Sequence, residues 1–91
     1  VKADPAAGQL LVSLRIDSEA VVRSNCIWAL GRLMDQLVQP RQAEIVEALV
    51  SALLHDGEIS VRDEARTALE QLEDPLVLER LQALINEGFI L

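Results

Sequence analysis

Apolar residues recur along most of this chain at spacings of three and four positions, which places them on one face of an α-helix. The segment 40–55 shows the pattern most clearly, with Ile45, Val46, Leu49, Val50, Leu53 and Leu54. The same periodicity, interrupted by Pro, Gly and short polar stretches, predicts five helices. Their expected ranges are 4–15, 19–38, 40–55, 60–73 and 75–87.

Capping residues support several of these helix ends. A helix start is indicated by Asp at the N-cap followed by Pro at the first helical position. Asp4-Pro5 and Asp74-Pro75 fit this description, and Gln39-Pro40 is a weaker version of it. Ser60 and Asp63 resemble a capping box, and Gly88 stands where the last helix is expected to stop.

The helical pattern occurs twice with an offset of 39 residues. Apolar, small and charged positions align together, which indicates a structural repeat. The matched pairs are Leu10/Leu49, Leu11/Val50, Leu14/Leu53, Asp17/Asp56, Glu19/Glu58, Val22/Val61, Arg23/Arg62, Ala29/Ala68, Leu30/Leu69 and Leu33/Leu72.

The pattern Asp-x-x-x-x-Val-Arg-x-x-Ala-x-x-Ala-Leu-x-x-Leu resembles HEAT repeats, particularly the bacterial subclass also found in phycobilisome bilin lyases. The second copy matches it fully, and the first departs only at Cys26. The resemblance implies an all-α superhelix of about two and a half antiparallel helix pairs. We expect one domain over 1–91, as part of a longer protein, with repeats at about 4–38 and 40–73 and a half repeat at about 75–88.

Helical geometry also predicts which side chains form the core. In the helix 19–38 the expected buried stripe is Val22, Cys26, Ala29, Leu30, Leu33 and Leu37. In the helix 60–73 it is Val61, Ala65, Ala68, Leu69 and Leu72, and in the last helix it is Leu76, Val77, Leu81, Leu84 and Ile85. The small residues in these stripes would allow neighbouring helices to approach closely.

Composition and charge narrow the range of partners. The hydrophobic fraction is 51% but the aromatic fraction is only 2%, which suits helices packed on helices. A net charge of −7 disfavours nucleic acid and anionic membrane surfaces. The single cysteine, Cys26, cannot form an internal disulfide and is compatible with a reducing cytoplasm.

The HEAT resemblance implies a structural role for two Asp–Arg pairs. Asp17 and Arg23 in the first repeat correspond to Asp56 and Arg62 in the second. In the family, the matching residues commonly link adjacent repeats by hydrogen bonds. An Arg fork suits this role because it satisfies a carboxylate and a backbone carbonyl together.

Trp28 is the candidate binding residue, because it lies opposite the predicted core stripe with Val21, Asn25 and Arg32 beside it. Trp and Arg are enriched among the residues that contribute most to protein interfaces. In HEAT-type solenoids this side would line the concave surface. The alternative is that Trp28 packs sideways against a neighbouring helix, or covers the end of the array where an earlier repeat was removed. The corresponding second-repeat stripe is polar: Ser60, Glu64, Thr67 and Gln71.

Catalysis and metal binding have little support in the sequence. Cys26 falls on the buried stripe, and one Cys with His55 cannot supply a zinc site. We therefore predict no enzyme activity and no cofactor. The carboxylates of the second repeat are either a solvated face or a patch that attracts a basic partner; they are Glu58, Asp63, Glu64, Glu70, Glu73 and Asp74.

The leading functional prediction is a protein–protein interaction module. The alternative is part of a bilin lyase-like, chromophore-handling protein, which rests on the repeat subclass alone. The uncapped ends of the array also allow a homodimer. The apolar tail 89–91 either folds back over an exposed end or binds elsewhere.

Overall fold

The computed structural model describes residues 3–89, which form α-helices and one short 3₁₀ helix but no strand. The all-α prediction is confirmed. The elements are α1 (Ala3–Ile16), α2 (Ala20–Leu33), η1 (Met34–Gln36), α3 (Arg41–His55), α4 (Ile59–Gln71) and α5 (Pro75–Asn86).

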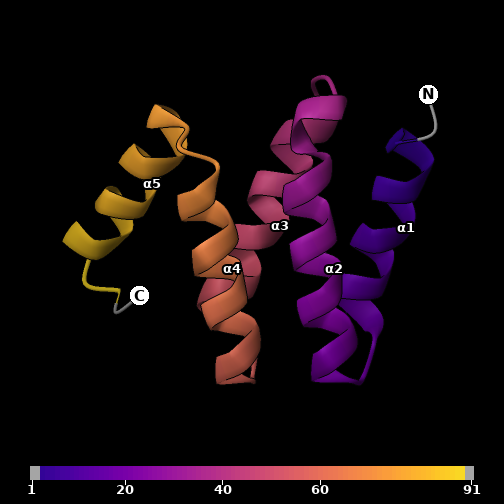
Figure 1. Cartoon of the computed structure of the whole chain (residues 1–91). Helices are drawn as coiled ribbons and strands as arrows, with labels where there is room; N and C mark the ends of the chain where they lie inside the picture. Colours follow the sequence, from indigo (N-terminus) through magenta and orange to yellow (C-terminus); the bar gives the residue numbers. More distant parts are fainter. Residues whose placement is uncertain (1–2, 90–91) are drawn as a thin grey trace.

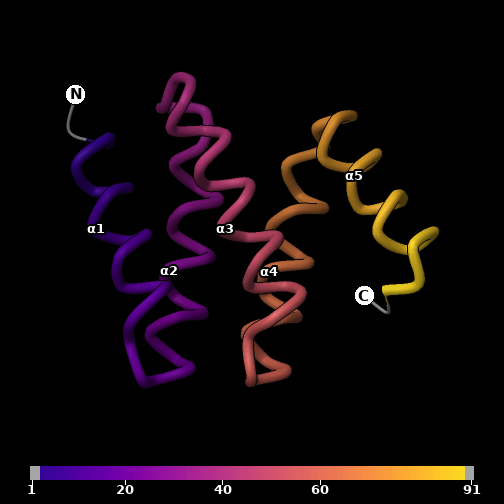
Figure 2. The backbone as a smooth tube through the Cα atoms, turned by 180° about the vertical axis from the view of Figure 1, so that it is seen from behind, coloured from indigo at the N-terminus to yellow at the C-terminus, as the bar shows by residue number. Residues whose placement is uncertain are grey.

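The helices pack as two antiparallel pairs and a fifth helix (Figure 1). α1 packs on α2, α3 packs on α4, and α2 lies along α4, so that the pairs stack side by side. α3 lies on the far side of α2 and α4, as the view from behind shows (Figure 2). The shortest dimension of 17 Å fits two layers of helices, whose axes usually lie about 8–10 Å apart. α5 contacts α4 at the end of the stack opposite to α1.

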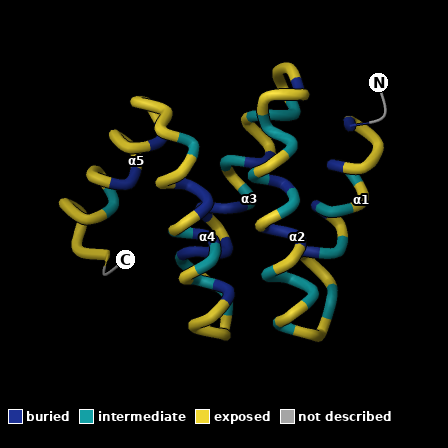
Figure 3. Tube along the Cα trace, in the orientation of Figure 1, coloured by how far each residue is buried: buried dark blue, intermediate teal, exposed yellow. Residues whose placement is uncertain are grey.

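The core runs between the two layers, where the inward faces of the helices meet (Figure 3). Most of the predicted stripe residues are buried, including Cys26 and Leu30 of α2 and Val61, Ala65 and Leu69 of α4. Ile27 is fully buried as well, although the predicted stripe omits it. It lies one turn before Gly31 on the same face of α2, and a Cβ at Gly31 would lie 3.7 Å from the Cβ of Ala68 in α4, an ordinary van der Waals contact. Ile27 is therefore buried because the repeats stack.

The second helix is shorter than predicted. α2 ends at Leu33, and a 3₁₀ turn and an extended segment replace the expected helix up to residue 38. The side-chain amide of Gln42 donates 2.9 Å hydrogen bonds to the carbonyl oxygens of both Met34 and Leu37. These bonds hold the non-helical segment against the start of α3, and Leu37 remains buried.

Of the four predicted helix starts, those at Asp4-Pro5, Gln39-Pro40 and Ser60 are wrong, and the one at Asp74-Pro75 is confirmed. Pro40 is the N-cap of α3, which begins at Arg41, so Pro40 is not its first helical residue. Asp4 lies inside the first turn of α1, and α4 begins at Ile59 with Glu58 as its N-cap, so Ser60 is not a cap. Asp74 caps α5, accepting a 2.9 Å hydrogen bond from the Leu76 N–H, with Pro75 as the first helical residue.

Gly88 ends the last helix as predicted. Its φ of +101° is the left-handed conformation that glycine adopts without strain. The N–H of Gly88 donates to the carbonyl of Ile85, and the N–H of Phe89 donates to that of Leu84. This pair of bonds is a Schellman motif, which satisfies carbonyls at the helix end.

α5 is less buried than predicted. Val77 and Leu81 are in the core, but Leu76 and Ile85 are exposed. The prediction was wrong for these two because no second helix of a third pair covers α5 within the described residues. Of the apolar tail, Phe89 is exposed, and Ile90 and Leu91 lie outside the described residues.

We expect Ile27→Ala to lower the free energy of unfolding by about 2–5 kcal/mol, because it removes a fully buried side chain at the stacking contact. Ile16→Ala is the matched control, since Ile16 is exposed, and we expect a change within about 0.5 kcal/mol. Urea unfolding followed by circular dichroism measures both. Equal effects of the two substitutions would contradict the assigned packing.

Candidate functional site

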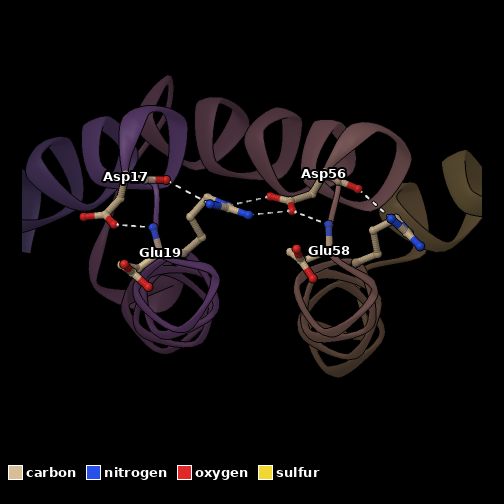
Figure 4. A network of polar contacts seen from close by, with 6 residues as sticks. Asp17, Glu19, Asp56 and Glu58 are labelled. Atoms are coloured by element: carbon tan, nitrogen blue, oxygen red, sulfur yellow. Dashed lines mark hydrogen bonds and ion pairs between the residues drawn. The ribbon is translucent and has the colours of Figure 1, made fainter.

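Two equivalent turns, one in each repeat, carry the hydrogen-bond network between the repeats. Asp17 directly follows α1 and Asp56 directly follows α3. Each carboxylate accepts a hydrogen bond from the N–H two residues later, Asp17 from Glu19 at 2.8 Å and Asp56 from Glu58 at 3.0 Å. Figure 4 shows the two turns side by side, in the same orientation at the starts of α2 and α4. The repeat in sequence is therefore also a repeat in local geometry.

Arg23 connects the two turns. Its Nε and Nη2 donate to the two carboxylate oxygens of Asp56, at 2.9 and 3.1 Å, and its Nη1 donates to the carbonyl oxygen of Asp17 at 2.9 Å. One guanidinium thus binds a carboxylate of the second repeat and a backbone carbonyl of its own repeat (Figure 4). Both side chains are largely covered, with exposed fractions of 15% for Arg23 and 9% for Asp56.

The surroundings of Asp56 favour its charged form. Burial has the largest single effect and raises the pKa of its carboxyl group, whereas hydrogen bonds from Arg23 and from the Glu58 N–H lower it. The charges of Arg23 and Arg62 act in the same direction, so the pKa lies below the ordinary value of 3.8. The hydrogen bond and the charge of Asp56 correspondingly raise the pKa of Arg23, against a smaller opposing effect of burial. The bridge is therefore fully ionised at neutral pH.

Asp17 and Arg62, the other members of the two predicted Asp–Arg pairs, form no ion pair of this kind among the described residues. Arg62 donates from Nη1 to the carbonyl oxygen of Asp56 at 2.7 Å, as Arg23 does to Asp17. Among residues 3–89, its guanidinium binds no carboxylate, and the Asp17 carboxylate binds no Arg or Lys. The structure thus joins Arg23 to Asp56, and places Asp17 and Arg62 at the two ends of the same row.

The candidate binding residues lie together on the outward face of α2. Val21, Asn25, Trp28 and Arg32 are all exposed. Their spacing of three and four residues puts them on one side of the helix, opposite the buried Cys26 and Leu30. Trp28 is 58% exposed, so its ring is not packed sideways under a neighbouring helix. The guanidinium carbon of Arg32 lies 5.3 Å from the centre of the indole ring, within cation–π distance.

The corresponding face of α4 carries no large apolar side chain. Ser60, Thr67 and Gln71 are exposed, and Glu64 is half-buried. The two repeats therefore share a backbone arrangement but present different outward surfaces. The apolar and aromatic character belongs to the first repeat alone.

Cys26 and His55 are poorly placed for chemistry. Cys26 is buried, and burial, together with the nearby negative charge of Asp17, raises the pKa of its thiol. A thiol with a raised pKa is a weak nucleophile at neutral pH. His55 is exposed at the end of α3. Within the described part of the chain, no group of three or more His, Cys, Asp or Glu residues is arranged to hold a metal ion.

The sequence interpretation missed a second pair of bridges, between the first helices of successive repeats. Arg41 of α3 binds Asp4 of α1 from Nε at 3.0 Å, and Arg80 of α5 binds Glu47 of α3. The two arginines stand 39 residues apart, so the repeat register extends into α5. That spacing was a usable signal, because it equals the offset of the other matched pairs.

No helix of the described residues is long and apolar enough to cross a membrane.

We expect Asp56→Asn to destabilise the fold by about 1.5–3 kcal/mol at neutral pH, the usual contribution of hydrogen bonds to charged groups. The folded pKa of Asp56 lies below the unfolded value of about 3.9, so its contribution is complete above about pH 4 and is lost as the pH falls through the folded pKa. The difference between wild type and variant should therefore shrink in acid.

Asp17→Asn is the matched control, because Asp17 occupies the same turn without an ion pair among the described residues. Urea unfolding at pH 7 and at pH 3 measures both variants. A loss of stability that is equal for the two variants, or that does not change with pH, would contradict the bridge.

We expect the thiol of Cys26 to react with iodoacetamide at least about a hundredfold more slowly in the native protein than in denaturing guanidinium chloride. The buried thiol becomes accessible only when the helices separate. Mass spectrometry of quenched samples measures the rate, and rapid alkylation of the native protein would show that the assigned burial is wrong.

Comparison with known proteins agrees with the repeat geometry. The family model for HEAT repeats matches residues 5–89. Neither the curated proteins nor the solved structures give a significant match. The match covers nearly all of the chain, including both helix pairs and α5. Stacked antiparallel pairs, a 39-residue register and a family match over this range show that the chain belongs to the HEAT-repeat family.

Proposed function

We propose that this chain binds a partner protein through the outward face of α2, defined by Val21, Asn25, Trp28 and Arg32. Protein–protein interaction is the general role of HEAT repeats. The observation that supports this particular surface is the exposure of Trp28, more than half of whose surface is open. A large aromatic side chain at an open position contributes little to the fold and is available to a partner.

The arrangement of the face suits a binding contact. Arg32 lies over the indole ring, so the two side chains restrict one another before a partner arrives. A pre-ordered contact loses less conformational entropy on binding than a mobile one. Val21 is exposed two helical turns before Trp28 on the same side of α2, which adds apolar area to this face. Asn25 adds an amide that can both donate and accept hydrogen bonds.

The concave surface of the array is part of the same proposal. In a HEAT solenoid the second helix of each pair lines the concave side, and α2 and α4 are these second helices. α4 would border the contact with its polar residues Ser60, Thr67 and Gln71. A partner would then meet an aromatic centre with a polar rim, which is the usual organisation of a protein interface.

The proposal assigns a binding role and no catalysis or cofactor. The thiol of Cys26 is buried, and the free cysteine suits a cytoplasmic location. The chromophore-handling alternative remains a prediction of the repeat subclass. Mixing the protein with a bilin and recording the absorption spectrum tests it, and a shifted band would favour that alternative.

A homodimer through the ends of the array is a further part of the proposal. The end at α1 and α2 offers the Asp17 carboxylate, which has no cation partner among the described residues. The end at α4 and α5 offers Arg62. Light scattering over a concentration series tests whether the two ends pair, and a constant monomer mass would remove the homodimer.

We expect Trp28→Ala and Arg32→Ala each to weaken the complex by about thirtyfold or more, the loss typical of residues at the centre of an interface. Thr67→Ala and Gln71→Ala are matched controls at the same repeat positions of α4, and we expect changes below threefold. Partners captured with the wild-type chain but lost with Trp28→Ala are identified, and their affinities are then measured by calorimetry.

Circular dichroism of all four variants checks that the fold is unchanged. Undiminished affinity in both Trp28→Ala and Arg32→Ala would overturn this placement of the site.

A further inference from the structure

An open groove lies between the end of α2 with η1, α3, the C-terminal end of α4 and α5, and of the residues of the proposed contact only Gln71 at its border lines the groove. Its volume is about 740 Å³, within the range of about 300–1,000 Å³ that specific ligand pockets occupy. Met34, Val46, Leu72 and Leu76 provide apolar lining. Polar and charged side chains provide much of the remaining lining, so the groove is amphipathic and open to solvent.

The groove occurs where the second repeat departs from the first. The connection between α2 and α3 is long, and it buries Leu37, whose exposed fraction is 6%. The connection between α4 and α5 is short, with Glu73 in the left-handed conformation at φ 52°. Leu76 occupies the same repeat position as Leu37, but it lies in the first turn of α5 and is 74% exposed. A leucine that is buried in the first repeat is thus presented to solvent in the second.

The charged residues around the groove are mostly acidic. Asp35, Glu47, Asp74 and Arg80 line it. Arg80 binds Glu47, and among residues 3–89 neither Asp35 nor Asp74 forms an ion pair. The oxygen Oδ1 of Asp74 accepts the Leu76 N–H at the start of α5, and the carboxylate keeps its negative charge in this bond. The groove therefore combines apolar side chains with two unpaired carboxylates.

We propose that this groove binds a cationic amphipathic segment of a partner protein. Apolar side chains of the segment would cover Leu76, Leu72 and Val46, and its Lys or Arg side chains would lie near Asp35 and Asp74. The two carboxylates and the net charge of −7 attract such a segment and repel an acidic one. This surface is separate from the outward face of α2, so either can be correct without the other.

A synthetic peptide of 14 residues with Leu on one helical face and Lys on the other is a suitable probe. A peptide with Glu in place of each Lys is its control. Binding to the full chain is measured by fluorescence anisotropy, and ¹⁵N chemical shifts map the site. We expect the Lys peptide to shift the amides of Val46, Leu72 and Leu76, and the Glu peptide to bind at least about tenfold more weakly.

Two substitutions with matched controls distinguish binding in the groove from nonspecific binding of the peptide. Leu76→Ser should weaken binding of the Lys peptide about tenfold. Leu78→Ser should not, because Leu78 is exposed on the same helix but does not line the groove. Asp35→Asn should weaken binding and reduce its salt dependence, whereas Glu70→Gln, outside the groove, should change neither.

The following results would overturn the proposal: absence of binding at millimolar peptide, equal affinity for the Lys and Glu peptides, equal effects of Leu76→Ser and Leu78→Ser, or chemical shifts centred on Trp28. Because both leucines are exposed, neither substitution should unfold the chain, and circular dichroism checks this.

Discussion

Where α2 packs along α4, two kinds of contact act together. Toward the C-terminal ends of the two helices, a Cβ at Gly31 would lie 3.7 Å from the Cβ of Ala68, and Ile27, one turn before Gly31, is fully buried. Near the helix starts, the Arg23 guanidinium joins the Asp56 carboxylate to the carbonyl of Asp17. The apolar contact supplies most of the stabilisation, since it removes apolar surface from water. The bridge fixes the register, because its paired hydrogen bonds tolerate little displacement.

The stacking also determines which residues remain available for binding. α2 uses one face for the core and one flank for α4, so its outward face keeps Trp28 and Arg32 exposed. α4 differs at its own outer flank. The positions that correspond to Ile27 and Gly31 are Arg66 and Glu70, which are charged. That flank presents these charged residues together with the exposed Ile59, whereas α2 has Ile27 and Gly31 at the same positions, although the backbone geometry of the two repeats is the same.

The second departure from the repeat concerns the connection to α5. The first helix of each following repeat carries an arginine, Arg41 in α3 and Arg80 in α5, that binds a carboxylate of the preceding repeat, so α5 follows the register of the array. The tight turn at Glu73 starts α5 early and leaves Leu76 in the open. The array thus remains in register while its surface acquires a groove. A repeat architecture can therefore vary the residues on its surface, and with them its binding, while the packing of its core stays the same.

The sequence by itself determined the five helices, the 39-residue register and most of the core. These features follow from helical periodicity and from residues with strong local preferences, such as Asp74, Pro75 and Gly88. Only the tertiary structure decided the end of α2, the burial of Ile27, the partner of Arg23 and the exposure of Trp28 and Leu76. Each of these depends on where a neighbouring helix lies. A helical repeat specifies its own faces through local spacing, but which face is covered is decided by packing between segments distant in the chain.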